Sequence, residues 1–306
     1  MADANAVKLL VLLGATASGK SALAMEIARR VGGEILCVDS MTVYRGMDIG
    51  TAKPTQQEQS EVRHHLLDLM EPTELFTVAR FVEMADATIA DAGRRGVPLI
   101  ATGGTPLYYK ALFEGLFDGP QADPELRQRL MAMGNDALHA RLSKVDSPAA
   151  ARIHVNDTKR LVRALEVYEL TGQPISSWQQ EWATGRLRHD ALFVGLSWEK
   201  EALNRRTNAR VKAMMEAGWL EEVRGLLERY GALSRTATEA TGYAELIDHV
   251  QGRMNLDDAA EQIKIATRQL ARKQMKWFRR FANTQWIAGD RPVGDLADEV
   301  MGMVGW

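Results

Sequence analysis

Short apolar runs bounded by turn residues alternate with helix-like segments along the first hundred residues and again near residue 190. The apolar runs have the length of buried strands, and the segments between them repeat apolar residues every three or four positions, as amphipathic helices do. This βαβ alternation predicts a parallel sheet with helices on both faces and ligands outside the carboxyl ends of its strands. We expect strands at Val7–Leu13, Glu34–Val38, Val97–Ala101, Ala191–Leu196 and Gln285–Ala288, and helices at Ser21–Val31 and Thr77–Arg95.

The strand pattern stops between Gly115 and about Asp190, where only helical periodicity remains. We therefore predict an α/β fold with a P-loop NTPase-like core, residues 1–115 and 191–306, and a helical insertion domain, residues 116–190. Asn156 or Asp157 would cap the last insertion helix, and Gly172 would end it. The insertion helices are expected at Pro124–Met133, Asn135–Lys144, Ser147–Ile153 and Asp157–Leu170, and further core helices at Glu199–Glu228 and Asp257–Phe281.

Composition narrows the class of protein. The chain has 306 residues and a formal charge of −2, so any nucleic-acid contact must come from a local basic cluster rather than a uniformly basic surface. The single cysteine, Cys37, excludes an internal disulfide and is expected to be buried and inert. No basic leader or long apolar run is present, which predicts a cytoplasmic protein without a membrane partner.

A Gly-rich segment between the first strand and the first helix fits the G-x-x-x-x-G-K-[ST] phosphate loop. Glycines turn backbone N–H groups toward a phosphate, the helix N-terminus adds positive potential, Lys20 adds a point charge, and the Ser21 hydroxyl can hold Mg²⁺. The alternative is a Gly-rich turn without a ligand. The proposed diphosphate-binding residues are Gly14, Ala15, Thr16, Ala17, Ser18, Gly19, Lys20 and Ser21.

Asp39 is the only acidic residue at the end of a predicted core strand. The strand Val97–Ala101 ends instead in Thr102-Gly103-Gly104-Thr105, although many P-loop NTP hydrolases and kinases place a magnesium-binding carboxylate there. Asp39 is therefore a Mg²⁺ ligand, a general base beside the phosphate site, or a turn cap. We favour the general base.

Two further segments follow strand ends, Tyr44–Pro54 and Thr102–Tyr109. Their glycines, hydroxyls and cations suit a diphosphate and a polar substrate in surface loops. The neighbouring His64 and His65 would point to opposite faces of an extended segment. This favours packing and hydrogen bonding over a shared metal ion.

Basic residues gather in two places. From Gln262 to Gly289 there is no Asp or Glu, and Lys264, Arg268, Arg272 and Lys276 recur every four residues as one stripe on a helix. A second cluster, Lys159–Arg163, lies in the insertion. Such runs are either solvated helix faces or surfaces for a phosphate-rich partner. Two of them beside a phosphate loop suggest a long polyanion.

Taken in order, the motifs between about residue 8 and residue 281 resemble tRNA dimethylallyltransferases. They are Gly14–Ser21, Asp39-Ser40-Met41, Tyr44–Pro54, His64–Asp68, Gly103-Gly104-Thr105, Arg160–Val167, Gly242-Tyr243 and Thr267–Arg279. The resemblance implies transfer of a dimethylallyl group from dimethylallyl diphosphate to N6 of the adenosine on the 3′ side of a tRNA anticodon, with Mg²⁺ and release of diphosphate.

The resemblance also implies roles for individual residues. Lys20 and Ser21 would hold the diphosphate and metal, Asp39 would be the base for the N6 amine, Thr105 would hydrogen-bond the bridging leaving-group oxygen, and Arg210 would close on the diphosphate. The partner would be the tRNA anticodon stem-loop, and the protein is expected to be a monomer. The matching tRNA-binding positions are Asp39, Ser40, Met41, Thr42, Thr105, Arg127, Lys159, Arg160, Leu161, Val162, Arg163, Arg272, Lys273, Lys276 and Arg279.

Some positions depart from the family pattern: Ala15 replaces a frequent Pro, Thr42 a frequent Gln, and Glu239 and Ala244 stand where basic residues are common. None of these changes removes a catalytic group. The alternatives are a prenyltransferase for free adenine nucleotides, which would not need the basic clusters, a P-loop small-molecule kinase, and a nonenzymatic RNA-binding protein with a relic phosphate loop.

Overall fold

The computed structural model describes residues 9–115, 119–180 and 187–306, and the chain forms two compact units. The first comprises Met1–Leu112 and His189–Trp306, and the second comprises Phe113–Arg188. These limits lie within three residues of the predicted insertion, residues 116–190.

The first unit is built on a six-stranded sheet with the order β3-β2-β4-β1-β5-β6, and every pairing is parallel. The predicted parallel sheet and its five strands are confirmed, while β3 is an additional two-residue strand at the edge. The strands are β1 (Leu9–Leu13), β2 (Glu34–Cys37), β3 (His64–His65), β4 (Leu99–Thr102), β5 (Leu192–Ser197) and β6 (Gln285–Ala288).

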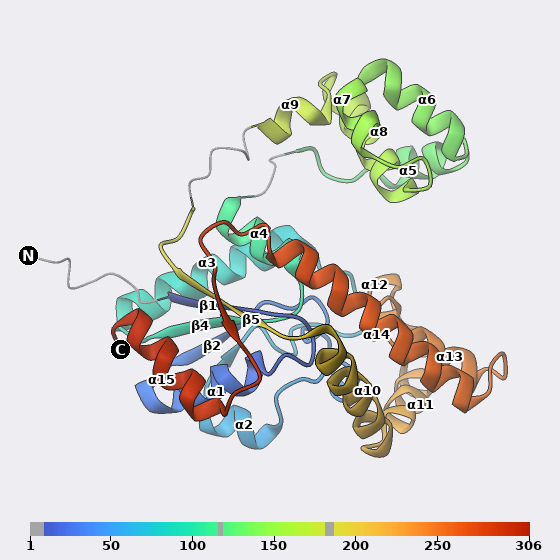
Figure 1. Ribbon diagram of the computed structural model, residues 1–306. Helices are drawn as coiled ribbons and strands as arrows, with labels where there is room; N and C mark the ends of the chain where they lie inside the picture. Colours follow the sequence, from blue (N-terminus) through green and yellow to red (C-terminus); the bar gives the residue numbers. More distant parts are fainter. Residues whose placement is uncertain (1–8, 116–118, 181–186) are drawn as a thin grey trace, which may run out of the picture. The chain divides into compact units, whose positions relative to one another are not determined.

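Helices cover both faces of this sheet (Figure 1). All five residues of β1 are buried, because it is a central strand with helices above and below. Helices α1 (Lys20–Val31) and α15 (Val293–Val304) lie side by side on one face, and α3 (Val78–Arg95) lies on the other. The apolar core therefore fixes the strand ends that carry the phosphate loop.

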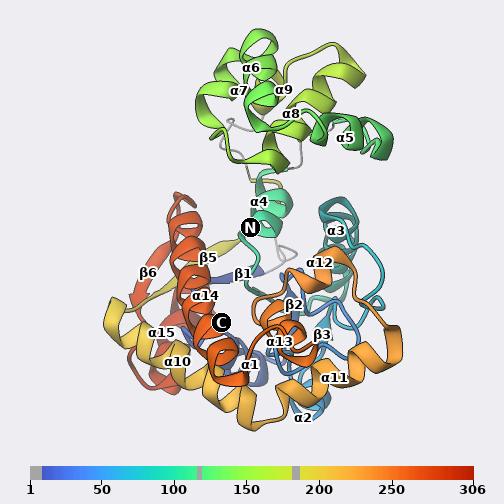
Figure 2. The same cartoon turned by 90° about the vertical axis from the view of Figure 1, so that its right-hand side faces the viewer.

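A group of helices lies beyond the carboxyl ends of the strands (Figures 1 and 2). In Figure 2, α10 and α14 lie side by side and α13 packs beside α14. The predicted single stretch Glu199–Glu228 is two helices, because Gly218, with φ of 97°, ends the first and begins the second. The group comprises α10 (Lys200–Glu216), α11 (Trp219–Tyr230), α12 (Arg235–Thr238), α13 (Tyr243–Val250) and α14 (Leu256–Phe278).

Two helices in the first part of the chain were not predicted. Helix α4 (Pro106–Glu114) occupies much of the segment that we expected to be a loop, and α2 (Gln56–Glu61) follows Pro54. The signal for α4 was present, since Thr105 followed by Pro106 is typical of a helix start with Pro in its first turn.

The second unit has an apolar core of its own, formed by residues such as Leu138, Leu161 and Leu165. Asp157 caps α8 by accepting a hydrogen bond from the Arg160 N–H, and Gly172, with φ of 71°, ends that helix, as predicted. The helices are α5 (Pro124–Met131), α6 (Asn135–Val145), α7 (Ser147–Arg152), α8 (Thr158–Thr171) and α9 (Ile175–Gln180).

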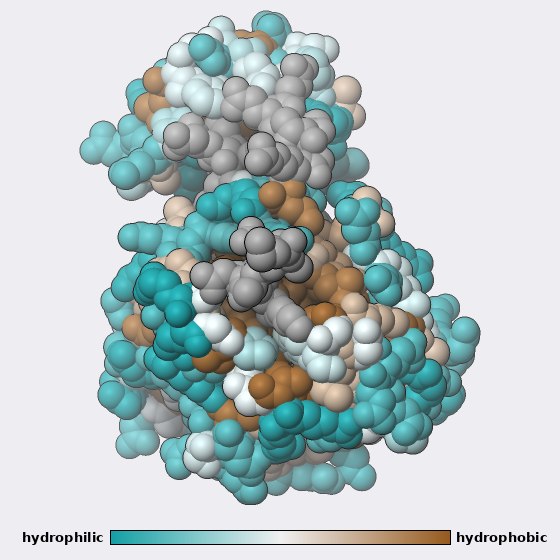
Figure 3. All heavy atoms as spheres, turned by 90° about the vertical axis from the view of Figure 1, so that its left-hand side faces the viewer, coloured by the Kyte–Doolittle hydropathy of each residue, from teal (hydrophilic) through white to brown (hydrophobic). Residues whose placement is uncertain are grey.

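On the face shown in Figure 3, hydrophilic side chains predominate and hydrophobic ones form small separate groups. Among the described residues, no helix is both long enough and apolar enough to cross a membrane.

Candidate active site

A cavity of about 300 Å³ opens at the carboxyl ends of the strands, entirely within the first unit. Residues far apart in the sequence meet there, because the ends of parallel strands lie along the same edge of a sheet. The cavity brings together most of the predicted core site. Its polar lining includes Thr16, Lys20, Ser21, Asp39, Ser40, Thr42, Thr105 and Arg210.

The phosphate loop joins β1 to α1, and the surrounding helices hold its backbone in place. Ala17 has φ of 63°, a left-handed conformation that is strained for alanine and that its surroundings must enforce. Arg206 donates a hydrogen bond of 2.8 Å to the Ala17 carbonyl, and the Trp198 indole donates one of 2.9 Å to the Ser18 carbonyl. Arg206 also stacks on Trp198, 4.4 Å from the ring centre. These contacts preorganise the loop.

Lys20, Arg210 and Asp39 share the cavity and shift one another's pKa values. Burial and the positive charge of Arg210 lower the pKa of Lys20 to about 8, although Asp39 opposes this shift. Burial also lowers the pKa of Arg210, again opposed by Asp39. Around Lys20, two cations stand against one carboxylate, a local positive balance that suits a diphosphate. The full lining of the cavity also includes Lys53, Glu58 and Glu239.

The Asp39 carboxylate accepts hydrogen bonds from the Met41 N–H at 2.9 Å and the Gly104 N–H at 2.8 Å. Burial raises the pKa of Asp39, while these hydrogen bonds and the charge of Lys20 oppose the rise. Asp39 thus makes the hydrogen bonds expected of a turn cap. The Thr42 N–H is a third hydrogen-bonding neighbour of this carboxylate. Three donors leave at least one of its four lone pairs free, so capping leaves the general-base prediction open.

The Gly103-Gly104 turn brings β4 against Asp39. A Cβ at Gly103 would lie 2.0 Å from the Val38 carbonyl oxygen, and one at Gly104 would lie 2.7 Å from Asp39 Oδ2. Thr105 follows directly, and its hydroxyl accepts a 2.9 Å hydrogen bond from the Ser40 N–H. Side chains larger than glycine would separate these groups, so the close approach requires both glycines.

Two hydroxyls in the cavity wall, Thr42 Oγ1 and Thr102 Oγ1, are buried without a hydrogen-bond partner in the described part of the chain. Buried polar groups are rarely left unpaired, so groups of this kind in a cavity wall suit a polar ligand. Thr42 is the position where the family often has Gln. Its hydroxyl has no partner among the described residues but is itself buried, and its side chain is shorter than that of glutamine.

Ser21 lines the cavity as expected for the predicted metal position. Among the described residues, no group of three or more His, Cys, Asp and Glu side chains gathers as a metal site. A Mg²⁺ ion needs few protein ligands, since it keeps several waters and takes phosphate oxygens from its substrate. One hydroxyl beside a phosphate loop is therefore a compatible donor set.

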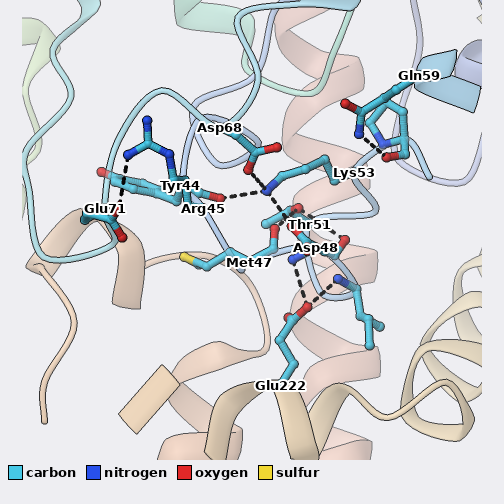
Figure 4. Close-up of polar contacts among 12 residues, drawn as sticks. Tyr44, Arg45, Met47, Asp48, Thr51, Lys53, Gln59, Asp68, Glu71 and Glu222 are labelled. Carbon is cyan, nitrogen blue, oxygen red and sulfur yellow. Dashed lines mark hydrogen bonds and ion pairs between the residues drawn. The ribbon is translucent and has the colours of Figure 1, made fainter. Parts of the chain in front are cut away.

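The end of the loop Tyr44–Pro54, residues 50–54, lines the cavity. Figure 4 shows the polar contacts that hold this loop. The Lys53 side chain is only 2% exposed, and its Nζ donates to Asp48 Oδ1, Asp68 Oδ1 at 2.6 Å and the Tyr44 carbonyl at 2.7 Å. Arg45 pairs with Glu71. We expected the cations of this loop to serve a diphosphate, but these two are engaged in holding the loop itself.

Helix α11 supports the same loop through Glu222. The Glu222 carboxylate accepts hydrogen bonds from the N–H groups of Asp48 at 2.8 Å and Ile49 at 2.6 Å (Figure 4). It accepts a third from the Gly50 N–H at 3.3 Å. It also accepts a 2.6 Å bond from the Tyr243 hydroxyl. One carboxylate therefore joins the cavity wall to α11 and α13.

The basic residues of α14 lie beside a second cavity of about 400 Å³, and Ala15 and Ser18 of the phosphate loop line this cavity too. Arg272, Lys276 and Arg279 line it, and Lys273 is exposed on the same helix. Arg268 donates a hydrogen bond to Asn208, and Lys264 pairs with Glu261. The two N-terminal residues of the predicted basic stripe thus already have partners within the protein.

The basic cluster of the insertion is also partly engaged. Arg127 and Arg163 both pair with Glu166, and Arg160 pairs with Asp157 at 2.6 Å. The predicted residues Leu161 and Val162 are buried in the core of the second unit, and Lys159 is exposed. Side chains within a core cannot touch RNA, so the prediction for the Leu161 and Val162 side chains is corrected.

The histidine pair and the cysteine behave as predicted. His64 Nδ1 lies 2.8 Å from the Val62 carbonyl oxygen, and His65 Nε2 lies 2.7 Å from Glu34 Oε2, so both rings are hydrogen-bonded. Cys37 is buried, and burial raises the pKa of its thiol.

Gln274 of α14 is the main site residue that the sequence analysis missed. Its amide accepts a 2.8 Å hydrogen bond from the Thr16 N–H and donates one of 2.7 Å to the Gly104 carbonyl, so it joins the phosphate loop to the turn beside Asp39. A signal existed, because Gln274 lies on the buried face of α14 with Ala271 and Phe278. A polar residue on an otherwise apolar helix face indicates a specific partner.

A phosphate loop on a central strand, with a cavity at the carboxyl ends of a parallel sheet, places this protein in the P-loop class of α/β proteins. The sequence model of the IPP transferase family matches residues 42–281, and the isopentenyl transferase model matches residues 7–73. The chain belongs to the IPP transferase family.

Relatives of the chain carry a consistent name. It is 45% identical to the tRNA dimethylallyltransferase of Geobacter metallireducens over 99% of both chains, and 46% identical to that of Anaeromyxobacter dehalogenans over 92% of this chain and 95% of the other. The structure resembles the full-length tRNA isopentenylpyrophosphate transferase of Bacillus halodurans, with 36% identity, a TM-score of 0.72 and 97% coverage of both chains. It also resembles a eukaryotic dimethylallyltransferase acting on tRNA, with 29% identity, a TM-score of 0.80, and 93% and 74% coverage.

Proposed function

We propose that this protein transfers the dimethylallyl group of dimethylallyl diphosphate to N6 of the adenosine on the 3′ side of a tRNA anticodon and releases diphosphate. The observation that carries the proposal is the cavity at the phosphate loop, whose lining brings together Lys20, Arg210 and the carboxylate of Asp39. The relatives' names supply the substrate class. Donor identity, target atom, residue roles and metal are proposals.

In the proposed reaction, the adenine N6 forms a bond to C1 of the allylic group while the bond from C1 to the bridging oxygen breaks. That electron pair leaves on the diphosphate, and the N6 proton passes to Asp39. The N6 lone pair is delocalised into the ring, so loss of this proton assists the attack. Lys20, Arg210 and the Thr105 hydroxyl would stabilise the charge that grows on the departing diphosphate.

The preorganised loop supports this assignment. The phosphate loop is already held in place by hydrogen bonds. It accepts bonds from Arg206 and Trp198 and donates one to Gln274, so it need not rearrange as the charge develops. Ser21 would hold Mg²⁺, which when bound would neutralise charge on the diphosphate oxygens.

The tRNA would be held by basic residues of both units. Arg272, Lys276 and Arg279 of α14 line a cavity beside the phosphate loop, which supports a role in holding phosphates there. Lys159, Arg160, Arg127 and Arg163 of the second unit are the other candidates. We further propose that the protein acts as a cytoplasmic monomer.

The direct test is mass analysis of tRNA after incubation with the protein, dimethylallyl diphosphate and Mg²⁺. The expected product gains one dimethylallyl group on the adenosine next to the anticodon. The matched control is Lys20→Ala, which should abolish transfer and leave tRNA binding largely intact, because Lys20 faces the donor. Near-normal single-turnover transfer by this variant would contradict the assignment of the donor site.

Parallel reactions separate the alternatives. Transfer to free AMP at the rate seen with tRNA would indicate a nucleotide prenyltransferase, and ATP turnover that depends on an acceptor would indicate a kinase. Binding of tRNA without any transfer would indicate a nonenzymatic RNA-binding protein.

A further inference from the structure

The second unit contains a carboxylate that is completely buried and bound on every side. Glu166 of α8 is 0% exposed. Its Oε1 accepts hydrogen bonds of 2.8 Å from the Asp123 N–H and from Arg127 Nε, and its Oε2 accepts bonds of 3.0 Å from Arg127 Nη2 and 2.6 Å from Arg163 Nη1. Burial alone would raise the pKa of Glu166, but the hydrogen bonds from both arginines outweigh it and lower the pKa. Glu166 is therefore an ionised anchor.

Glu166 holds two arginines that remain partly exposed. The side chain of Arg127 is 39% exposed and that of Arg163 is 30% exposed. Arg127 binds Glu166 through two nitrogens, which sets the plane of its guanidinium. Arg163 is held from two sides, because its Nη2 also donates a 2.9 Å bond to the Pro120 carbonyl. Free arginine side chains lose considerable rotamer entropy when they bind a ligand, whereas these two are already ordered.

The net charge of this cluster is small. One carboxylate offsets one of two guanidinium charges, so the pair attracts distant phosphates less than two unpaired arginines would. The N–H groups of Arg127 that do not face Glu166 have no hydrogen-bond partner among the described residues. Arg127 and Arg163 thus offer hydrogen-bond donors in fixed positions, while their attraction for distant phosphates is reduced.

We propose that Glu166 is a positioning residue that converts Arg127 and Arg163 into a rigid pair able to recognise the shape of an RNA backbone, and that it thereby favours the anticodon stem-loop over other RNA of equal charge. This inference rests on the proposed function, because it requires the second unit to contact tRNA. In this proposal, Glu166 increases the preference of the protein for the anticodon stem-loop and does not increase its affinity for RNA in general.

The test compares binding of two RNAs by the full-length protein across a salt series: an anticodon stem-loop and a straight duplex with the same number of phosphates. Glu166→Gln should lower the preference for the stem-loop by about tenfold, since the arginines lose their fixed geometry. It should also tighten duplex binding at low salt and steepen the salt slope of log K by about 0.7–0.9 for each new phosphate contact.

The matched control is Glu169→Gln on the same helix. Glu169 pairs with Arg141 at 2.7 Å and is not among the residues expected to hold RNA. This variant has the same charge change and should keep the parent preference. If Glu166 were only structural, Glu166→Gln would weaken binding of both RNAs equally. That result, or an unchanged preference, would overturn the proposal.

A second variant keeps the test valid if Glu166→Gln unfolds the unit. Glu166→Asp retains the charge, but its side chain is one methylene shorter and cannot reach both arginines in the same geometry. It should lose the preference without a change in salt slope, and retention of the preference would overturn the proposal. Failure of the proposed function itself would be seen earlier, as a parent protein that does not bind or modify tRNA.

Discussion

At the residue scale, the proposed roles of Asp39 and Lys20 depend on the surroundings of these side chains more than on their residue types. Both line one cavity, Lys20 buried and Asp39 partly exposed, and each changes the other's pKa. Neither side chain would be unusual on a surface. Their proximity to Arg210 and to one another makes their protonation states sensitive to a bound diphosphate.

Asp39→Asn is expected to slow transfer by about 10²–10⁴, the range typical of losing a general base. The amide can still accept a hydrogen bond but cannot take up the N6 proton, so binding of both substrates should change little. Single-turnover transfer at saturating substrates measures the effect. An unchanged rate would leave Asp39 as a cap for the Met41 and Gly104 N–H groups.

Binding of dimethylallyl diphosphate is expected to take up a proton at Lys20. The pKa of Lys20 is lowered to about 8, so in the free protein at pH 8 about half of the molecules lack this charge. A bound diphosphate favours the charged form and raises the pKa, so affinity should fall as the pH rises above 8, by up to about tenfold per pH unit. Calorimetry in two buffers with different ionisation enthalpies measures the uptake.

Lys20→Arg serves as the control for this linkage, since a guanidinium stays charged throughout the range. It should show no uptake near pH 8 even where its affinity is reduced. Equal uptake by the parent and the variant would assign the proton to another group.

At the scale of elements, α11 and α14 decide how the cavity is enclosed. Helix α14 supplies Gln274 to the phosphate loop, and α11 supplies Glu222 to the loop Tyr44–Pro54. Each helix uses one polar side chain to hold a backbone segment that its own sequence does not stabilise. Changes in these helices should therefore affect loops distant in the sequence.

Glu222→Gln is expected to destabilise the protein by about 1–3 kcal/mol, because an amide has one acceptor oxygen for the four donors that the carboxylate now serves. Urea unfolding measures the change. The neighbouring Glu221→Gln is the control. Glu221 is exposed and forms an ion pair with Arg224 on the surface of α11, so this variant should change stability by less than about 0.5 kcal/mol. If both variants lowered the free energy of unfolding by similar amounts, the hydrogen bonds of Glu222 would not be important for stability.

Neutralising Arg272 and Lys276 of α14 with glutamine should weaken tRNA binding and lower the salt slope of log K by about 0.7–0.9 for each lost phosphate contact. Affinity for dimethylallyl diphosphate should not change. Lys264→Gln is the control, since Lys264 already pairs with Glu261. A slope identical to that of the parent would identify the Arg272 and Lys276 face as solvated, with the RNA contacts elsewhere.

At the scale of the whole molecule, the two units have separate cores, and the described cavity belongs to one of them. The Arg188 N–H donates a 2.8 Å hydrogen bond to the Phe113 carbonyl, so the two ends of the second unit lie together. The second unit is therefore inserted at a single point of the chain and can be removed without leaving a wide gap.

Replacing Phe113–Arg188 by a short Gly-rich linker should leave a folded first unit that binds dimethylallyl diphosphate with near-parental affinity. Binding of the anticodon stem-loop should fall by at least about tenfold, because the Lys159–Arg163 cluster is lost with the insertion. Calorimetry with each ligand tests both expectations. Unchanged stem-loop binding would show that the first unit alone holds the tRNA.

The sequence by itself determined the features that depend on neighbouring residues. Strand and helix periodicity, the Asp157 cap, the Gly172 stop and the phosphate loop are all set by residues within a few positions of one another, so their patterns predict them directly. Asp39 was also found, because it directly follows a recognisable strand. The break at Gly218 was missed, since helical periodicity continues on both sides of it.

The tertiary structure decided which side chains meet. Gln274 lies 258 residues from the Thr16 N–H that it binds, and Lys53 and Arg45 turn out to serve their own loop rather than a diphosphate. The buried positions of Leu161 and Val162, and the pairing of Arg127 with Glu166, likewise depend on how α5 and α8 pack. Arg163, by contrast, pairs with Glu166 three residues further along the same helix. Periodicity predicts which face of an element is apolar, whereas the partner of each polar group depends on packing between distant segments of the chain.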